Sequence, residues 1–304
     1  MIELRHFRQF VAVAEESNFR RAAARLHMAQ PPLTAAIRKI EAEIGTRLIA
    51  RHNRIEGLTP AGEAFLLEAR RALAQADRAI DMARRAGEGA TGSLRVSFVA
   101  SAARDLLPRT LRNFRERHDK VALELKEATT SEQVVLLQQD RADVGIVVSQ
   151  LPKADGLNML TVRKRGLLAA LPAGHRACAK QRLSLAALAD EPWILFPARQ
   201  GPGLHRQILA ACSAAGFVPH VVQEAVQMET IVALVAGGLG VSLVPPSFAE
   251  AGRADIAFRA LRGPGSPVNY ELAIAFAKHS PLINEFIRCV GSAVDEMDGK
   301  RRKK

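Results

Sequence analysis

One short segment, QPPLTAAIRKIEAEIG (residues 30–45), combines an apolar stripe with a polar face. The stripe begins at Leu33, recurs at helical spacing and stops at Gly45, where a helix usually ends. Amide and hydroxyl groups near a helix start can hydrogen-bond to base edges of DNA, and cations can reach phosphates. The spacing therefore indicates recognition of nucleic acid. The polar positions are Gln30, Thr34, Arg38 and Lys39.

A second predicted helix, residues 19–26, precedes this segment, and Ser17 or Asn18 can cap its start. Only the turn His27–Gln30 separates the two helices, and the two prolines that follow suit the first turn of the second helix. A compact crossed pair is typical of a helix-turn-helix, whose second helix enters the major groove. An ordinary all-α core is the alternative, and the polar face favours DNA binding.

Three further segments must position this pair. Residues 2–16 are predicted to form a helix that supplies its core. Residues 46–58 contain a basic, turn-prone tip, which predicts a two-stranded wing with Arg51 or Arg54 near a phosphate or the minor groove. A solvated loop is the alternative reading of that tip. From Thr59, a capping residue, a long helix runs to about Gly87.

The long helix carries a heptad pattern. Large residues repeat every seven positions, and alanines follow each of them by three. An exposed apolar seam needs a partner helix, so the pattern predicts a homodimer. GEGATG (87–92) then marks a linker. The repeating residues are Leu66, Leu73 and Ile80, with Ala69, Ala76 and Ala83.

Composition sets wider bounds. The chain has 304 residues, 48% hydrophobic and 24% charged, as expected for a soluble protein of two or three domains. No long apolar run or signal segment occurs, which predicts a cytoplasmic protein without membrane contact. The net charge is +12, and the terminal KRRKK is expected to be a solvated, disordered tail. The three cysteines are scattered, which favours buried inert thiols over a disulfide or zinc site.

Beyond Ser93, predicted strands and helices alternate, which indicates βαβ units with a parallel sheet. The strands are too many for one small sheet, so we expect two α/β lobes with a cleft between them. Ligands of such folds lie at the carboxyl ends of strands, near helix starts that favour anions. The predicted strands are 94–99, 121–127, 144–148, 167–171, 193–196, 218–223, 241–244 and 269–277, and the helices are 106–117, 131–139, 204–215, 228–236 and 281–297.

Residues 3–66 closely resemble the N-terminal region of LysR-type transcriptional regulators, through the AAxxLHxAQPPLT, IRKIExEIG and LTPAGE blocks. The resemblance continues through SFVASAARDLLP, RADVGIVV, WILFP and VALVAGGLGVSLVPPS. It is strongest to the subgroup that senses muconate and benzoate. It implies an α+β multidomain chain: a winged helix-turn-helix, a dimerising linker helix and a two-lobed effector domain resembling periplasmic binding proteins.

The implied boundaries are 1–58 for the DNA-binding domain, 59–91 for the linker helix and 92–298 for the effector domain. Lobe I would span about 92–162 and 267–298, lobe II about 163–266, and the basic tail 299–304. The implied partners are double-stranded promoter DNA and a small organic-acid effector, with RNA polymerase left open. The family usually assembles as homotetramers, and its members switch DNA bending when ligand binds between the lobes. No cofactor or metal is implied.

The family's site residues carry over by position. For effector binding, hydroxyls and helix-start N–H groups suit a carboxylate, and simple helix capping is the alternative. Two departures matter: Ala35 and Ala36 remove base-reading side chains, and Val148 stands where the subgroup can carry an arginine. The second departure favours an aromatic acid of lower charge. The DNA-binding residues would be Gln30, Pro31, Pro32, Thr34, Arg38, Lys39, Arg51 and Arg54. The effector-binding residues would be Ser101, Thr129, Thr130, Pro202, Gly203 and Leu204.

An enzyme is the main rival class. The chain has no GxSxG, HExxH or P-loop motif, and its glycine-rich GGLGVSLVP follows a helix rather than a strand. His205 is a lone histidine without a predicted partner. A ligand-binding α/β protein or enzyme whose N-terminal helices serve only dimerisation is the remaining alternative. The sequence favours a regulator without catalytic residues.

Overall fold

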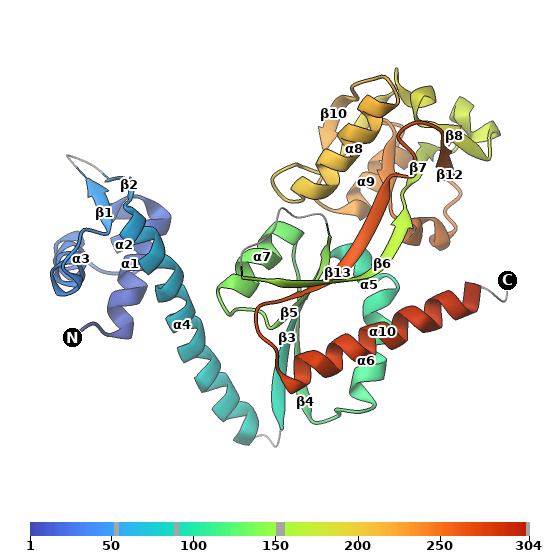
Figure 1. The fold of residues 1–304 in the computed structure, drawn as a ribbon. Coiled ribbons are helices and arrows are strands. Elements are labelled where there is room, and N and C mark those ends of the chain that lie inside the picture. Colours follow the sequence, from blue (N-terminus) through green and yellow to red (C-terminus); the bar gives the residue numbers. More distant parts are fainter. Residues whose placement is uncertain (52–54, 88–90, 150–155, 302–304) are drawn as a thin grey trace. The chain divides into compact units, whose positions relative to one another are not determined.

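The computed structural model describes residues 1–51, 55–87, 91–149 and 156–301 (Figure 1). The chain forms two units, which we describe separately. The first comprises Met1–Gly89 with Gln139–Arg141, and the second comprises Ala90–Gln138 and Ala142–Lys304. Among the described helices, none is long and apolar enough to cross a membrane.

Three helices pack around one core in the first unit: α1 (Leu4–Glu16), α2 (Phe19–Arg25) and α3 (Gln30–Ile44). Phe10 and Leu33 are fully buried in this core. The predicted helix pair is thus confirmed. Gly45 ends α3 with a φ of 79°, a left-handed conformation that glycine adopts without strain.

Asn18 caps α2, because its side chain accepts hydrogen bonds from the backbone N–H groups of Arg20 (2.9 Å) and Arg21 (3.1 Å). Asn18→Ala would leave both donors without this acceptor. We expect it to lower the free energy of unfolding of the first unit by about 1 kcal/mol. Thermal unfolding checks this, with Asn18→Asp as a capping control, and equal stability of the alanine variant would contradict it.

The predicted wing is confirmed as a pair of antiparallel strands, β1 (Ile49–Arg51) and β2 (Ile55–Leu58). The buried carboxylate of Glu41 on α3 accepts hydrogen bonds from the backbone N–H groups of Leu48 (3.0 Å) and Ile49 (3.2 Å). The start of the wing is therefore fixed to the C-terminal part of α3.

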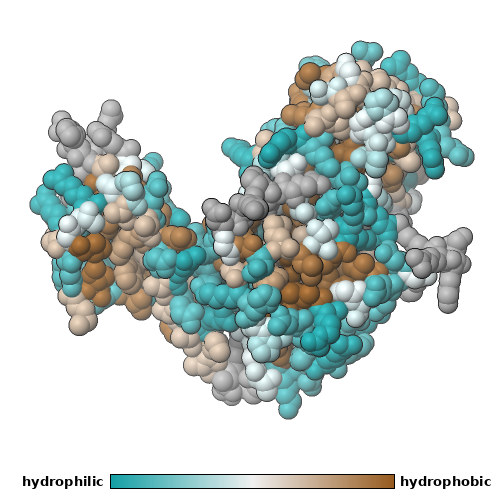
Figure 2. All heavy atoms as spheres, in the orientation of Figure 1, coloured by the Kyte–Doolittle hydropathy of each residue, from teal (hydrophilic) through white to brown (hydrophobic). Residues whose placement is uncertain are grey.

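Helix α4 (Pro60–Gly87) begins where predicted, and the Thr59 hydroxyl accepts a hydrogen bond from the Gly62 N–H at 3.0 Å. The first part of the heptad seam is used within the chain, since Leu66 packs against the core of the first unit and Ala69 is buried there. The later seam residues Ile80 and Ala83 are exposed, Ile80 by 57%. Hydrophobic patches are visible on this unit in Figure 2. Only the later part of the seam is left for a partner.

In the second unit, a five-stranded sheet has the order β4-β3-β5-β13-β6. Strands β3, β4 and β5 are parallel, as predicted, but β13 is antiparallel to both β5 and β6. The expectation of a parallel sheet is wrong here because β13 enters the sheet last and between two earlier strands. The strands are β3 (Gly92–Phe98), β4 (Val121–Glu127), β5 (Val144–Val148), β6 (Asn158–Gly166) and β13 (Asn269–Phe276). The helices around them are α5 (Ala100–Ala103), α6 (Leu106–Arg115), α7 (Thr130–Gln138) and α10 (Pro281–Arg301). We call this part lobe I.

Lobe II contains a mostly antiparallel sheet of order β11-β7-β12-β8 and the parallel pair β9 and β10. Strands β6, β8 and β12 were not predicted: β6 lies at a sheet edge and carries three cations, β8 is short, and β12 lies between the predicted strands 241–244 and 269–277. The strands are β7 (Leu168–Pro172), β8 (Arg182–Ser184), β9 (Pro192–Leu195), β10 (His220–Glu224), β11 (Ser242–Val244) and β12 (Ile256–Arg262). The helices are α8 (Pro202–Ala214) and α9 (Met228–Ala236), with short 3-10 turns at Arg176–Ala179, Leu185–Leu188 and Pro246–Ala251.

The chain crosses between the lobes twice, and the two crossings lie side by side. After β6 it enters β7, and after β12 it returns into β13 (Figure 1). Asn269 pairs with Gly166, and the Leu167 N–H donates to the Val268 carbonyl at 2.8 Å. The lobes are therefore joined by a hydrogen-bonded pair of segments.

Helix α10 extends to Arg301, so residues 299–301, expected in a disordered tail, are helical. Residues 302–304 lie outside the described residues. As predicted, Cys212 and Cys289 are buried, and burial raises the pKa of the Cys212 thiol to about 11. At neutral pH it is the protonated, unreactive thiol.

Candidate nucleic-acid interface and ligand pocket

The outer face of α3 holds most of the predicted DNA-binding side chains. Thr34 is half-buried, and its hydroxyl donates to the Gln30 carbonyl at 3.1 Å, which leaves it free to accept from a base. Arg51 closes β1, and Arg54 lies outside the described residues. Of the predicted DNA-binding residues on α3, those that are exposed are Gln30, Pro31, Pro32, Arg38 and Lys39.

Ala35 is exposed on the same helix, and Ala36 is half-buried. Neither methyl group can hydrogen-bond to a base edge. On α3, the amide of Gln30 and the hydroxyl of Thr34 thus precede the two alanines, and the cations Arg38 and Lys39 follow them. Sequence reasoning foresaw this arrangement because all of these residues lie on one helix.

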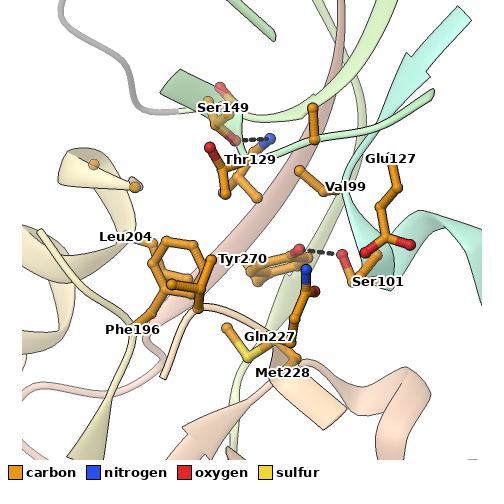
Figure 3. A pocket seen from close by; sticks show the side chains of 17 residues that line it. Val99, Ser101, Glu127, Thr129, Ser149, Phe196, Leu204, Gln227, Met228 and Tyr270 are labelled. Carbon is orange, nitrogen blue, oxygen red and sulfur yellow. Dashed lines mark hydrogen bonds between the residues drawn. The ribbon is translucent and has the colours of Figure 1, made fainter. Parts of the chain in front are cut away.

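A pocket that is partly open to solvent lies between the two lobes of the second unit (Figure 3). Five of the six predicted effector-binding residues line it. Pro202 does not, although it begins α8 beside the pocket. The pocket therefore brings together segments that lie far apart in the sequence. The predicted residues on its wall are Ser101, Thr129, Thr130, Gly203 and Leu204.

The hydroxyls of this pocket already have partners. Ser101 is buried and hydrogen-bonds to the phenol of Tyr270. Thr130 accepts a hydrogen bond from the Val148 N–H at 3.1 Å. Thr129 accepts from the Glu132 N–H at 3.4 Å and donates to the Glu132 carboxylate at 2.9 Å, which is the capping role left open by the sequence.

Among the described residues, four helices begin at the pocket: α5, which spans only four residues, and α7, α8 and α9. The caps of α8 and α9 are Gly201, which has no side chain, and Gln227, whose side chain makes no capping hydrogen bond. The first N–H groups of a helix have no intrahelical acceptor, and the helix dipole adds positive potential there. These two helix starts therefore offer unused donors to an anion.

Sequence reasoning missed Tyr270, Phe196, Gln227 and Met228, all of which line the pocket. Burial raises the pKa of Tyr270 far above its usual range, so the phenol stays protonated. Figure 3 shows Phe196 and Leu204 on one side and Ser101 on the other. Tyr270 is the only tyrosine of the chain, the one signal in the sequence that sets it apart.

Comparisons with known proteins cover both units. Residues 4–63 match the family described as bacterial regulatory helix-turn-helix protein, lysR family, and residues 87–295 match the LysR substrate binding domain. The chain is 37% identical over 288 residues to the HTH-type transcriptional regulator AlsR of Bacillus subtilis (strain 168), covering 94% of each chain. It is 33% identical over 294 residues to the regulator CatR of Pseudomonas putida, covering 97% of this chain and 100% of CatR. The crystal structure of full-length CbnR with its target DNA superposes with a TM-score of 0.68 at 30% identity, covering 96% of this chain and 100% of that one.

Proposed function

Because the chain belongs to the LysR family of bacterial transcriptional regulators, we propose that a small organic acid in the pocket between the lobes switches its promoter binding or DNA bending. The chain is a DNA-binding regulator with an effector-binding domain, and not an enzyme. The match of residues 4–63 also removes the alternative in which the N-terminal helices serve only dimerisation.

One observation carries the organic-acid proposal: α8 and α9 begin at the pocket without side-chain caps. A carboxylate would accept hydrogen bonds from their first N–H groups. Val148 lines the pocket where an arginine would have paired with a second carboxylate. Phe196 and Leu204 provide an apolar wall. These features together support an acid with one carboxylate and an apolar or aromatic body.

The assembly follows from α4. The seam residues Ile80 and Ala83 remain exposed on its later part, and we propose that two copies pair there to form a dimer that further assembles into a tetramer. We propose that the DNA-binding domain spans residues 1–58, the linker helix 59–91 and the effector domain 92–298. Gln30, Thr34, Arg38 and Lys39, with Arg51 and Arg54 on the wing, are proposed to face the DNA.

A thermal-shift screen of benzoate, cinnamate and related monocarboxylates on the full-length protein tests the pocket. We expect at least one to raise the melting temperature of the wild type and to change the mobility of its complex with promoter DNA. Ser101→Ala is expected to lower the starting stability by about 1–3 kcal/mol, because it leaves the buried Tyr270 phenol without its partner. It should also remove the ligand-induced shift.

Ser213→Ala is the matched control, because Ser213 is exposed on α8 and does not line the pocket. It should retain the full shift. A full shift in Ser101→Ala would remove Ser101 from the site, and the absence of any shift across the carboxylates in the wild type would contradict the organic-acid proposal.

A further inference from the structure

Glu127 is the one charged side chain among the described residues that line the pocket. It is the last residue of β4 and is exposed, so its carboxylate reaches the pocket from lobe I. Within the described part of the chain, no hydrogen-bond or ion-pair partner holds this carboxylate. Figure 3 places it on the side of Ser101, away from Phe196 and Leu204.

Lobe II supplies positive potential to the pocket, opposite in sign to the Glu127 carboxylate. Helices α8 and α9 begin at the pocket without side-chain caps, so their first N–H groups carry partial positive charge. Helix α7 differs from them: the Thr129 hydroxyl caps it, and its Ser131 N–H donates to the Gln200 carbonyl at 3.3 Å. Helix α5 of lobe I also begins at the pocket without a side-chain cap, but it spans only four residues. Among the longer helices, the unused donors therefore belong to lobe II, and the unused negative charge belongs to lobe I.

Apolar side chains fill the wall between these two ends. Phe196 and Leu204 are joined there by Met228 and Val99 (Figure 3). A matching ligand has one negative group, one positive group and an apolar body.

We propose that the effector is a zwitterion of this kind: an α-amino acid with an apolar or aromatic side chain. Its carboxylate binds at the starts of α8 and α9, its ammonium group binds Glu127, and its side chain packs against Phe196 and Leu204. The proposal rests on the organic-acid function above and narrows its ligand class. The ligand would connect lobe II to lobe I through its two charges.

A simple carboxylic acid fits the pocket less well. It has no positive group to pair with Glu127, and its carboxylate and Glu127 carry like charges, which repel. An ammonium group instead forms a charge-assisted hydrogen bond with Glu127, which is stronger than a bond between neutral groups. Among otherwise equal ligands, the amino group is therefore what Glu127 selects.

Isothermal titration calorimetry on the full-length protein tests this with matched pairs: L-phenylalanine against 3-phenylpropionate, and L-leucine against 4-methylpentanoate. In the wild type, we expect at least one amino acid to bind about tenfold or more tightly than its desamino partner. Glu127→Gln should weaken the amino acid about tenfold and strengthen the desamino acid. Glu116→Gln, an equal loss of charge at an exposed position away from the pocket, should behave as the wild type.

The outcomes separate this inference from the function on which it rests. Tighter binding of the desamino acids to the wild type, or amino-acid affinity unchanged in Glu127→Gln, would overturn the zwitterion while leaving the organic-acid pocket in place. Failure of both members of every pair to bind would overturn the zwitterion and count against the carboxylate site itself.

Discussion

Gly62→Ala is expected to unfold the first unit and abolish DNA binding by the full-length protein. A Cβ atom on Gly62 would lie 1.9 Å from the carbonyl oxygen of Leu48 and 2.9 Å from its carbonyl carbon. Both are backbone atoms, so a change of side-chain rotamer cannot relieve the clash. The same carbonyl accepts a hydrogen bond from the Thr59 N–H at 3.0 Å, which fixes the start of α4 against the wing.

Relief of this clash would require α4 to move away from the segment that leads into β1. Leu48 is 1% exposed, so that movement would open the core of the first unit. We expect a loss of about 3 kcal/mol or more in the free energy of unfolding. Scanning calorimetry follows the unfolding of this unit, and a mobility-shift assay follows DNA binding.

Gly291→Ala is the matched control for this prediction. Gly291 also lies within a helix, α10, but nothing lies within 4 Å of a Cβ added there. Alanine is the better helix former, so this change should be neutral or stabilise by up to about 1 kcal/mol. Similar effects of the two substitutions would show that the contact with Leu48 is not decisive.

Arg38→Ala is expected to weaken binding to promoter DNA by about tenfold to a hundredfold, which corresponds to about 1–3 kcal/mol. Arg38 is exposed on α3, and the neighbouring Ala35 cannot hydrogen-bond to DNA. Few side chains of α3 are therefore available to replace a contact that Arg38 makes. The fold should be unaffected, because the side chain leaves no cavity.

Mobility shifts at several salt concentrations distinguish two roles for Arg38. Loss of a phosphate contact lowers the salt dependence of binding by about one ion, whereas loss of a base contact reduces sequence preference. Arg112→Ala, an exposed arginine on α6 of the second unit, removes the same charge elsewhere and serves as the control. Equal affinity of Arg38→Ala and the wild type would exclude this residue from the interface.

The helix-turn-helix was predictable because its signals are local. Periodicity, the Asn18 cap and Gly45 lie within one stretch of chain, and the structure confirms each of them. The heptad repeat of α4 was predicted correctly, but the burial of the first part of its apolar seam within the chain was not predicted. Burial of Ala69 against the chain's own core depends on tertiary packing, which a repeat in the sequence does not report.

The pocket was only half predictable for a similar reason. Ser101 lies at the end of a recognisable strand, but its partner Tyr270 is 169 positions further along the chain. That contact exists because β13 returns from lobe II and inserts between β5 and β6. No local sequence pattern indicates that β13 inserts between two earlier strands. The prediction that it runs parallel to them was therefore wrong.

The two crossings beside Leu167 and Val268 have a mechanical consequence. Two hydrogen-bonded segments can bend together out of the plane of their hydrogen bonds. They resist sliding along each other, because sliding would break the register between β6 and β13. Relative movement of the lobes is thereby restricted to a rotation about these two segments. A ligand that binds between the lobes could therefore move them only by changing the angle between them.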